Sequence, residues 1–337
     1  MAIVEQILTS DNADLYRLIL DIPIPGYSDF ITPWLIKESG FGLAMGTGLY
    51  RTILVDPGPA CGIPSLLECL SQLGVRRLDY VLLTHIHIDH AGGIADLASA
   101  YPALKVVAHD RGRVHLLDPA RLWEASVQTL GDVAKAFGPI SPLRERNLLP
   151  QFRGVEGITV IDTPGHAPHH QSYLFRCGER DVLFSGEAAG VYLRGNYLRP
   201  ATPPRFFYDV SQNSLDRLRA VSASAICYGH CGYSHDVSHL LQAAGAQLAL
   251  WRDVVGDVAT GAAGAKAPGG RPMAPADPEA QVDACLERLL AADPNLSEFA
   301  DLDPDIRDRE VFYLKSSIRG FMGEGPRRSS TGCAGTM

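Results

Sequence analysis

The segment THIHIDHAGG at residues 84–93 concentrates residue types that bind metal ions. His85, His87, Asp89 and His90 fall within six consecutive positions. Imidazole nitrogens and carboxylate oxygens are donors that transition metals accept. Because side chains alternate along an extended segment, the spacing predicts that His85, His87 and Asp89 share one side while His90 turns away. Such an arrangement can serve two neighbouring metal positions.

Further metal-binding residue types follow three apolar runs later in the chain. ITVIDTPGH ends in His166, DVLFSGE ends in Glu187, and SAICYGH ends in His230. Runs of β-branched and apolar residues that stop at Gly, Pro or polar residues indicate buried strands. The polar residues of interest therefore lie at strand ends, where layered folds place their sites.

Helical patterns alternate with the strand-like runs. IPSLLECLSQLG from residue 63, IADLASAY from 94, SLDRLRAVSAS from 214 and VSHLLQAAGAQLALWRDVV from 237 carry apolar residues at helical spacing. Further strand-like runs cover residues 53–58, 80–85 and 104–109. Strands separated by helices predict layered α/β packing.

Taken together, these motifs resemble the metallo-β-lactamase superfamily. His85-x-His87-x-Asp89-His90 followed by Ala-Gly-Gly is similar to the signature of that fold, and looks most like its glyoxalase II and lactonase-type branches. TPGH, SGEAAG and YGH follow in the family's order, and the resemblance covers roughly residues 20–255. It implies an α/β fold, a four-layered αβ/βα sandwich.

The resemblance also implies two metal-binding groups joined by a bridging acid. These are His85, His87 and His166 in one group, Asp89, His90 and His230 in the other, and Glu187 as the bridge. The donors are all nitrogen or oxygen, which favours two divalent metal ions, Zn²⁺ first, with Fe or Mn as alternatives. The family usually has aspartate at the bridging position, so the longer Glu187 leaves a mononuclear site or an altered metal preference open.

The implied chemistry is hydrolysis of a small-molecule substrate. Two cations lower the pKa of a shared water from 15.7 to about 7 and polarise a substrate carbonyl. Asp89 would orient the resulting hydroxide and carry a proton to the leaving group. The leading hypothesis is a metal-dependent hydrolase of a thioester or lactone. The alternative is an oxidoreductase, because some relatives use mononuclear iron to oxidise a persulfide. The intact ligand set argues against a non-catalytic binder.

Several residues near the motifs are expected to support the metal ligands. Asp56 ends the run ILVDPG, and metal-binding histidines commonly donate their free N–H to a carboxylate. Capping of the turn that follows is an equal alternative for this residue. Thr84 is expected to brace the loop through its hydroxyl. One of His169 and His170 is a further candidate for a supporting role.

Other polar residues near the motifs are weaker candidates for a catalytic or metal-binding role. Lactonase-type relatives carry a tyrosine three residues after the bridging acid, where this chain has Gly190. Tyr192 is the nearest substitute, although a packed structural role fits it better. His235 and His239 have the i, i+4 spacing of a helical zinc site. Since better ligands are already assigned, we interpret this pair as decoys.

We predict a catalytic domain at residues 1–255 that carries a helical insertion and is followed by a linker, a helical extension and a tail. Residues 111–150 contain a helical insertion, a candidate lid or pocket wall, with simple cover of a sheet edge as an equal alternative. Residues 256–278 have the Gly, Ala and Pro content of a linker. Two helical patterns at 279–323 form an extension that could cover the pocket or form a dimer interface. The tail at 324–337 is expected to be disordered.

Composition narrows the classes of function. The net charge of −8 opposes binding to nucleic acid. There is no basic start followed by an apolar run and no stretch long enough to cross a bilayer, so neither a secretory signal nor a membrane partner is predicted. The 7 cysteines contain no C-x-x-C pair, which argues against a disulfide framework and a cysteine–zinc site. We predict a cytoplasmic protein, with a homodimer as a candidate assembly.

Overall fold

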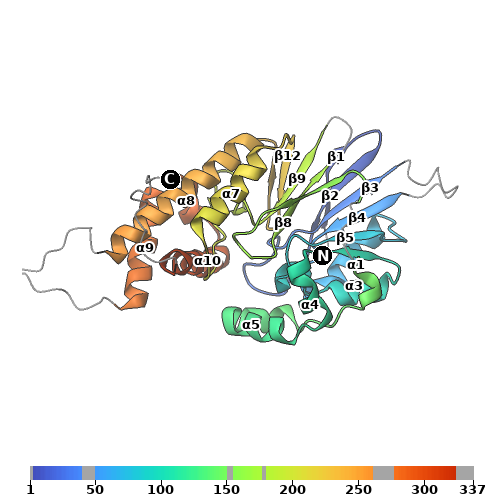
Figure 1. Cartoon of the computed structure of the whole chain (residues 1–337), viewed down its shortest axis with the longest axis horizontal. Coiled ribbons are helices and arrows are strands. Elements are labelled where there is room, and N and C mark those ends of the chain that lie inside the picture. Colours follow the sequence, from blue (N-terminus) through green and yellow to red (C-terminus); the bar gives the residue numbers. More distant parts are fainter. Residues whose placement is uncertain (1–2, 40–49, 150–154, 177–179, 261–276, 324–337) are drawn as a thin grey trace, which may run out of the picture.

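The computed structural model contains two β-sheets packed against each other, with helices on the outer face of each (Figure 1). The structure describes residues 3–39, 50–149, 155–176, 180–260 and 277–323. The arrangement confirms the predicted four-layered αβ/βα sandwich. The predicted disordered tail at 324–337 lies outside the described residues.

The first sheet has six strands in sequential order. They are β1 Ile3–Thr9, β2 Ala13–Ile19, β3 Trp34–Glu38, β4 Arg51–Val55, β5 Tyr80–Leu82 and β6 Lys105–Val107. The first four strands pair antiparallel, and β4, β5 and β6 pair parallel. Helices α1 (Ile63–Gln72) and α3 (Ile94–Ala100) supply the connections that parallel pairing requires, and they cover the outer face of this sheet.

The second sheet has five strands in the order β13-β12-β9-β8-β7. Their bounds are β7 Ile158–Asp162, β8 Gln171–Phe175, β9 Val182–Gly186, β12 Ala225–Tyr228 and β13 Tyr233–Ser234. A separate pair joins β10 Val191–Tyr192 and β11 Leu198–Arg199. Helices α7 (Tyr208–Arg219) and α8 (Val237–Ala259) cover the outer face, because their apolar residues pack with those of β8, β9 and β12.

A hydrophobic core between the two sheets holds them together. Trp34 and Ile53 of the first sheet pack there with Tyr173 and Phe184 of the second, and all four are at most 1% exposed. The Trp34 indole N–H donates a hydrogen bond of 2.8 Å to the carbonyl of Tyr228. Since this core fixes the sheets relative to each other, it also fixes the loops at their shared edge.

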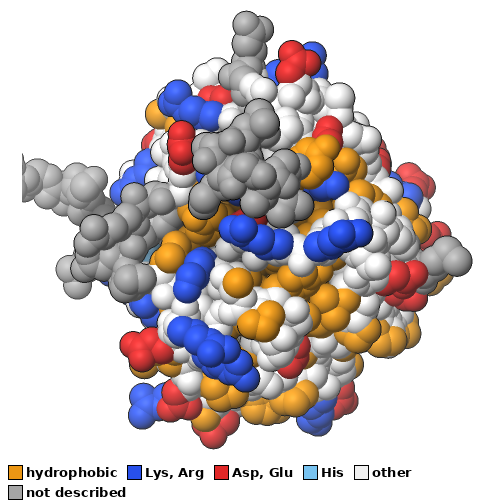
Figure 2. All heavy atoms as spheres, turned by 90° about the vertical axis from the view of Figure 1, so that its right-hand side faces the viewer, with side chains coloured by type: hydrophobic (Ala, Val, Ile, Leu, Met, Phe, Trp, Pro, Cys, Tyr) orange, Lys and Arg blue, Asp and Glu red, His pale blue; other side chains and the backbone are white. Residues whose placement is uncertain are grey.

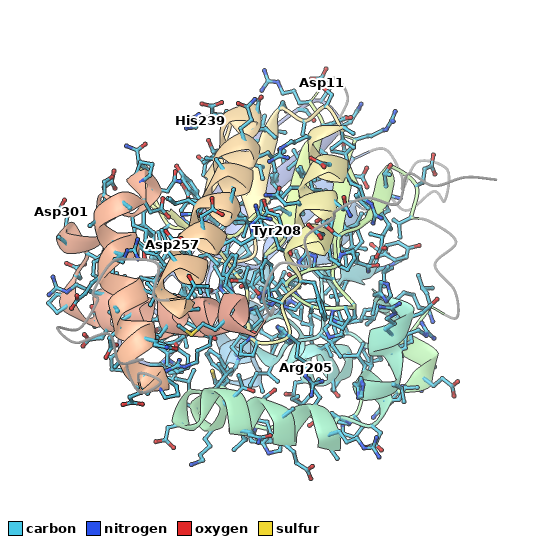
Figure 3. The ribbon with its side chains drawn as sticks, turned by 60° about the vertical axis from the view of Figure 1, so that its left-hand side comes forward. Asp11, Arg205, Tyr208, His239, Asp257 and Asp301 are labelled. Atoms are coloured by element: carbon cyan, nitrogen blue, oxygen red, sulfur yellow. The ribbon has the colours of Figure 1, made fainter. Side chains whose placement is uncertain are left out.

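The segment predicted as a helical insertion forms three helices. They are α4 Asp110–Leu117, α5 Ala120–Leu130 and α6 Asp132–Phe137. No residue of α5 is fully buried, although Leu122, Trp123 and Val127 pack partly against the first core. Helix α5 lies away from both sheets and below α10 (Pro304–Met322) in two views (Figure 1 and Figure 3).

The C-terminal helices belong to the core of the second layer. Helix α9 (Pro278–Ala292) and α10 pack with α8 in one hydrophobic cluster. Helix α8 continues to Ala259, into the start of the segment predicted as a linker, and residues 261–276 lie outside the described part of the chain. Short 3-10 helices lie at Ala60–Gly62, Glu145–Asn147, Pro294–Leu296 and Phe299–Asp301. The short helix α2 spans the four residues Ile88–Ala91.

Helix α10 is attached to the rest of the molecule by buried charges. Glu310 is fully buried and accepts hydrogen bonds from the guanidinium groups of Arg199, at 2.5 Å, and Arg309, at 3.0 Å. Arg309 also donates to the carbonyl of Gly26. At Gly26, with φ of 77°, an added Cβ would lie 2.4 Å from the carbonyl oxygen of Asp305, so the close contact with α10 requires glycine.

Within the described residues, no helix combines the length and apolarity needed to cross a membrane. The face seen from the right-hand side of Figure 1 mixes Lys and Arg side chains with hydrophobic and acidic ones (Figure 2). This face is one end of the sandwich, remote from α9 and α10 (Figure 1).

The buried charges predict a stability defect. Glu310→Gln should lower the free energy of unfolding by about 3 kcal/mol, because it leaves two buried guanidinium groups without their anion. Urea unfolding followed by circular dichroism measures this. Glu279→Gln is the matched control, since Glu279 pairs with Arg319 at the surface, where an ion pair contributes about 0–1 kcal/mol. Equal midpoints for the two variants would contradict the assignment.

Candidate metal centre

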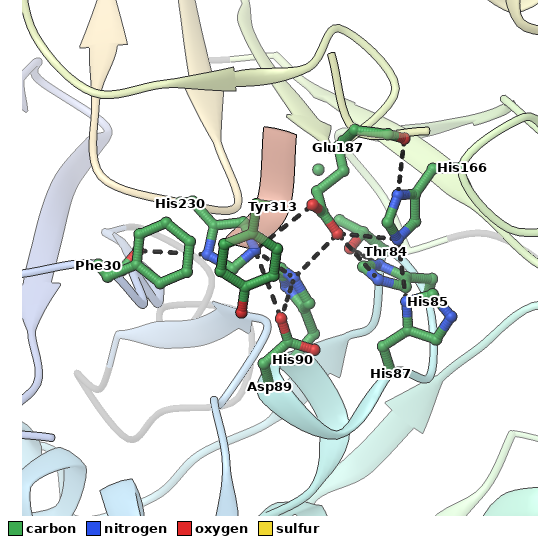
Figure 4. Close-up of polar contacts among 12 residues, drawn as sticks. Phe30, Thr84, His85, His87, Asp89, His90, His166, Glu187, His230 and Tyr313 are labelled. Atoms are coloured by element: carbon green, nitrogen blue, oxygen red, sulfur yellow. Dashed lines mark hydrogen bonds and ion pairs between the residues drawn. The ribbon is translucent and has the colours of Figure 1, made fainter. Parts of the chain in front are cut away.

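The residues singled out from the sequence meet at the edge where strand ends of both sheets converge (Figure 4). His85 and His87 follow β5, and Asp89 and His90 lie in α2. The remaining three follow strands of the second sheet: His166 comes after β7, Glu187 directly after β9, and His230 after β12. All seven side chains are buried or half-buried.

The side chains of the HxHxDH segment at residues 85–90 do not alternate between two sides as those of an extended strand would. The extended backbone that we predicted ends at His87, which caps the short helix Ile88–Ala91. Helical backbone turns adjacent side chains about 100° apart instead of opposite each other. The prediction that Asp89 shares a side with His85 and His87 is therefore wrong: Asp89 lies with His90.

The first group contains His85, His87, His166 and Glu187, and it offers ligand atoms that lie within 4.8 Å of one another. His166 Nε2 lies 2.9 Å from His87 Nδ1 and 2.9 Å from Glu187 Oε2. His85 Nε2 lies 3.3 Å from the same carboxylate oxygen. This group thus presents three imidazole nitrogens and one carboxylate.

The second group contains Asp89, His90 and His230, with ligand atoms also within 4.8 Å of one another. His90 Nε2 lies 3.2 Å from His230 Nε2, and Asp89 Oδ2 lies 3.7 Å and 3.5 Å from these two atoms. The Glu187 carboxylate approaches this group too, with 3.5 Å from Oε2 to His90 and 3.5 Å from Oε1 to His230. Glu187 therefore lies between the groups, as a bridging acid would.

The spacing of these donors fits metal coordination. Two ligands of a tetrahedral zinc ion with bonds of about 2.0–2.1 Å are separated by roughly 3.3 Å. The separations between 2.9 and 3.7 Å bracket that value. His85 Nε2 is buried and has no hydrogen-bond partner among the described residues. A buried acceptor without a partner costs free energy that a cation at this position would offset.

Hydrogen bonds on the outer side of the cluster orient the imidazoles. The Asp56 carboxylate accepts from the Thr84 hydroxyl at 2.6 Å, from the Thr84 backbone N–H at 2.8 Å and from His90 Nδ1 at 3.0 Å. Because the Thr84 hydroxyl donates to Asp56, it accepts from His85 Nδ1, 3.0 Å away. Both histidines therefore direct Nε2 inward, as the nitrogen that would bind a metal ion. The structure places the predicted supporting residues Asp56 and Thr84 together behind the ligands.

Backbone carbonyls orient two of the remaining histidines. His166 Nδ1 donates to the carbonyl of Ala201 at 2.9 Å, and His230 Nδ1 donates to that of Phe30 at 3.3 Å. These bonds again leave Nε2 as the atom that faces the cluster. His230 is also held by its stacking on the Phe30 ring, with centroids 4.2 Å apart.

His170, one of the two candidates that follow His166, supports Glu187. Its Nε2 accepts the Glu187 backbone N–H at 3.0 Å, so its Nδ1 carries the proton and donates to the Thr163 hydroxyl at 2.9 Å. An added Cβ at Gly186, which has φ of 55°, would lie 2.5 Å from the same Nε2. Glycine thus permits the turn after β9 that seats the longer glutamate.

The imidazoles of the cluster differ in their pKa values, because some face other imidazoles and others face carboxylates. Burial, together with the neighbouring imidazoles, lowers the pKa of His85 well below its usual range and that of His87 to about 4. Burial opposes the charged form of His90 as well, but the Asp89 charge and the hydrogen bonds that His90 donates to the carboxylates of Asp56 and Glu187 raise its pKa well above the usual value. The pKa of His166 is raised chiefly by Glu187, against the effect of burial.

The secondary candidates fall outside the cluster. The Tyr192 hydroxyl donates to the carbonyl of Gly195, and the ring packs at 5.5 Å from that of Tyr228, which fits the packed role. His235 and His239 are exposed, and His239 lies at the outer end of α8 (Figure 3). Sequence reasoning missed Tyr313 of α10, whose ring stacks on Phe30 and whose hydroxyl points to the side of Asp89 in Figure 4. No motif marks it, because it comes from a remote helix.

Comparison with known proteins agrees with this geometry. The family described as the metallo-beta-lactamase superfamily matches residues 50–230, more than half of the chain. The chain belongs to the metallo-beta-lactamase superfamily. Its members are mostly hydrolases, and the His, Asp and Glu cluster of this superfamily protein is a metal-binding cluster.

Two curated relatives and one solved structure illustrate the relationship. The chain is 31% identical to the metallo-beta-lactamase fold-containing protein ST1585 of Sulfurisphaera tokodaii over 54% of this chain and 69% of that protein. It is 29% identical to a hydroxyacylglutathione hydrolase of Cupriavidus taiwanensis over 68% of this chain and 74% of the relative. The structure of TTHA1429 from Thermus thermophilus shares the fold, with a TM-score of 0.54 and 24% identity over 73% of this chain and 82% of the other.

The support behind the ligands yields a prediction for metal affinity. Asp56→Asn removes the charge that holds His90 and Thr84, so the affinity for Zn²⁺ should fall about 10- to 100-fold. Competition with a chromophoric chelator measures the change. The control Asp216→Asn alters an exposed aspartate that pairs with Arg219, and it should leave the affinity as in the wild type. An unchanged affinity in Asp56→Asn would contradict the orienting role.

The raised pKa of His90 predicts proton release on metal binding. Protonated His90 stabilises the folded, metal-free protein at pH values below about 6.5, the pKa of histidine in the unfolded chain. This stabilisation is lost as the pH rises through the higher pKa that His90 has in the folded protein. A metal ion must displace that proton. At pH 7, calorimetric titration with Zn²⁺ in buffers of different ionisation enthalpy should show release of about one proton or more per chain. Affinity should rise with pH and then level off; a pH-independent affinity would refute this.

Proposed function

We propose that this protein hydrolyses an ester-like bond, a thioester or a lactone, in a small molecule. The observation that carries the proposal is the pair of complete donor groups with Glu187 between them. Such a pair supports binding of two divalent ions, and the all-nitrogen and oxygen donor set favours Zn²⁺, with Fe or Mn as alternatives. When bound, the ions would supply an acidified water and a Lewis acid for the substrate carbonyl.

The chain's own residues then orient the water and move its proton. Asp89 is 9% exposed and faces His90 and His230 with one oxygen, which leaves its other oxygen for a hydrogen bond. This carboxylate can orient the attacking water and carry a proton towards the leaving group. Burial excludes bulk water from the group, which strengthens each electrostatic contact inside it.

The relatives support the choice of substrate class. Similarity to hydroxyacylglutathione hydrolases, at 29% identity, favours a thioester. The insertion helix α5, whose apolar side chains Leu122, Trp123 and Val127 are only partly buried, stays a candidate for the wall of the substrate site. The net charge of −8 disfavours nucleic acid as a substrate. The cytoplasmic location and the homodimer stay predictions.

A substrate panel tests the proposal. Metal-loaded protein should turn over acyl-thioesters or lactones, and His87→Ala should lose about 100-fold or more of kcat/KM, because it removes a proposed metal ligand. His239→Ala is the matched control, since it removes an exposed imidazole outside the cluster. Absence of metal-dependent turnover across the panel would reject the proposal.

Metal content separates this proposal from the oxidoreductase alternative. Elemental analysis of protein purified without chelators should show about two metal ions per chain. A single iron, together with oxygen uptake in the presence of glutathione persulfide, would instead support a mononuclear dioxygenase. The second donor group of Asp89, His90 and His230 favours the first outcome, because a mononuclear site leaves part of it without a role.

A further inference from the structure

The wall of the metal centre beside the second group is aromatic and comes from two distant parts of the chain. Phe30, from the loop between β2 and β3, stacks on His230. Tyr313, from α10, stacks on Phe30 with centroids 5.7 Å apart. Figure 4 shows the Tyr313 ring in front of His230, with its hydroxyl on the side of Asp89. The C-terminal extension therefore contributes directly to the wall of the site.

Tyr313 shares one hydrogen bond with a second phenol. The hydroxyl oxygens of Tyr27 and Tyr313 lie 3.2 Å apart, and neither has another hydrogen-bond partner among the described residues. Two hydroxyl protons are present but this bond uses only one, so one O–H remains free to donate. Tyr27 is 4% exposed, whereas Tyr313 is less buried. The free donor is therefore best placed on Tyr313, with Tyr27 donating to it.

Asp89 lies close enough to influence both phenols electrostatically. Burial raises the pKa of Tyr27 and Tyr313, and the negative charge of Asp89 adds to the increase for each. Both groups therefore stay protonated at neutral pH, where even an unperturbed tyrosine, with a pKa of about 10, is a donor. A protonated hydroxyl on the side of the site where Asp89 lies can donate to an oxygen of a molecule bound there.

Buried charges hold this hydroxyl in place. The Arg199 guanidinium lies over the Tyr313 ring, 4.8 Å from its centroid, and that of Arg309 lies over Phe30 at 3.9 Å. Both guanidinium groups bind Glu310, three residues before Tyr313 on α10. A donor held this firmly loses little entropy when a substrate binds, which is the condition for stabilising a developing charge.

We propose that the Tyr313 hydroxyl binds the substrate by donating a hydrogen bond to its carbonyl oxygen, an inference that rests on the proposed hydrolytic function. When a water oxygen adds to the carbonyl carbon, negative charge develops on the carbonyl oxygen, and the phenol stabilises it while keeping its own proton. The carbon–sulfur or carbon–oxygen bond then breaks, and the leaving group takes the proton that the water has released. Helix α10 is thus part of the active site.

Removal of one oxygen atom tests this role. Tyr313→Phe keeps the ring that stacks on Phe30, and it should lower kcat about 100- to 1,000-fold while KM changes little, as for the loss of one oxyanion donor. Tyr192→Phe removes a hydroxyl whose hydrogen bond among the described residues goes to the carbonyl of Gly195, and it should match the wild type. Metal content and melting temperature are measured for each variant. An unchanged kcat in Tyr313→Phe overturns the proposal, and so does a loss that tracks loss of metal or of folding.

A binding measurement gives a second test that does not depend on turnover. Phenylphosphonate, a tetrahedral oxyanion, is titrated calorimetrically into metal-loaded wild type and Tyr313→Phe. The variant should show a Kd about 10-fold higher, which corresponds to one hydrogen bond to a charged group. Equal Kd values, or no binding to the wild type, overturn the proposal. An inactive wild type that still binds phenylphosphonate more tightly than the variant would instead reject only the proposed ester hydrolysis.

Discussion

The cost of burying ionisable groups is the constraint on which this structure depends. Seven imidazoles and carboxylates share one interior site, where an isolated charge is strongly unfavourable. Opposite charges offset part of the cost: the pKa of Glu187 is held well below its usual range by His166 and His230, against the effect of burial. His85 Nε2 forms no hydrogen bond among the described residues, although the Glu187 carboxylate lies 3.3 Å away. The cluster is therefore arranged for cations, which would supply the missing positive charge.

Satisfying the outward-facing atoms of the cluster determines much of the surrounding backbone. The Asp56 carboxylate accepts three hydrogen bonds. The Asp56 backbone has a φ of 50°, in the left-handed region that a residue with a Cβ seldom adopts. Strain of this kind persists where neighbouring contacts outweigh it. The hydrogen bonds from Thr84 and His90 are such contacts. Through Asp56, the backbone conformation at the end of β4 is thus coupled to the orientation of the proposed metal ligand His90.

The proposed active site is a composite of three parts of the chain. The two sheets supply the proposed ligands, the loop before β3 supplies Phe30, and α10 supplies Tyr313. The charged group of Arg199, Arg309 and Glu310 joins these parts out of contact with solvent. Since breaking such a group is more costly than breaking a surface pair, the C-terminal helices are integral to the centre and not an accessory to it.

The sequence alone was sufficient for the fold class and for the seven members of the cluster, because strand ends and dense metal-binding motifs are local signals. Strand alternation alone put Asp89 on the wrong side, because the helix at Ile88–Ala91 places it with His90, whereas the division implied by the family resemblance agrees with the two groups. The sequence was also silent on Tyr313, and it left His169 and His170 as equal candidates. Those outcomes depend on contacts between segments far apart in the chain. Such contacts form only when the two sheets and α10 have packed, and no local pattern encodes them.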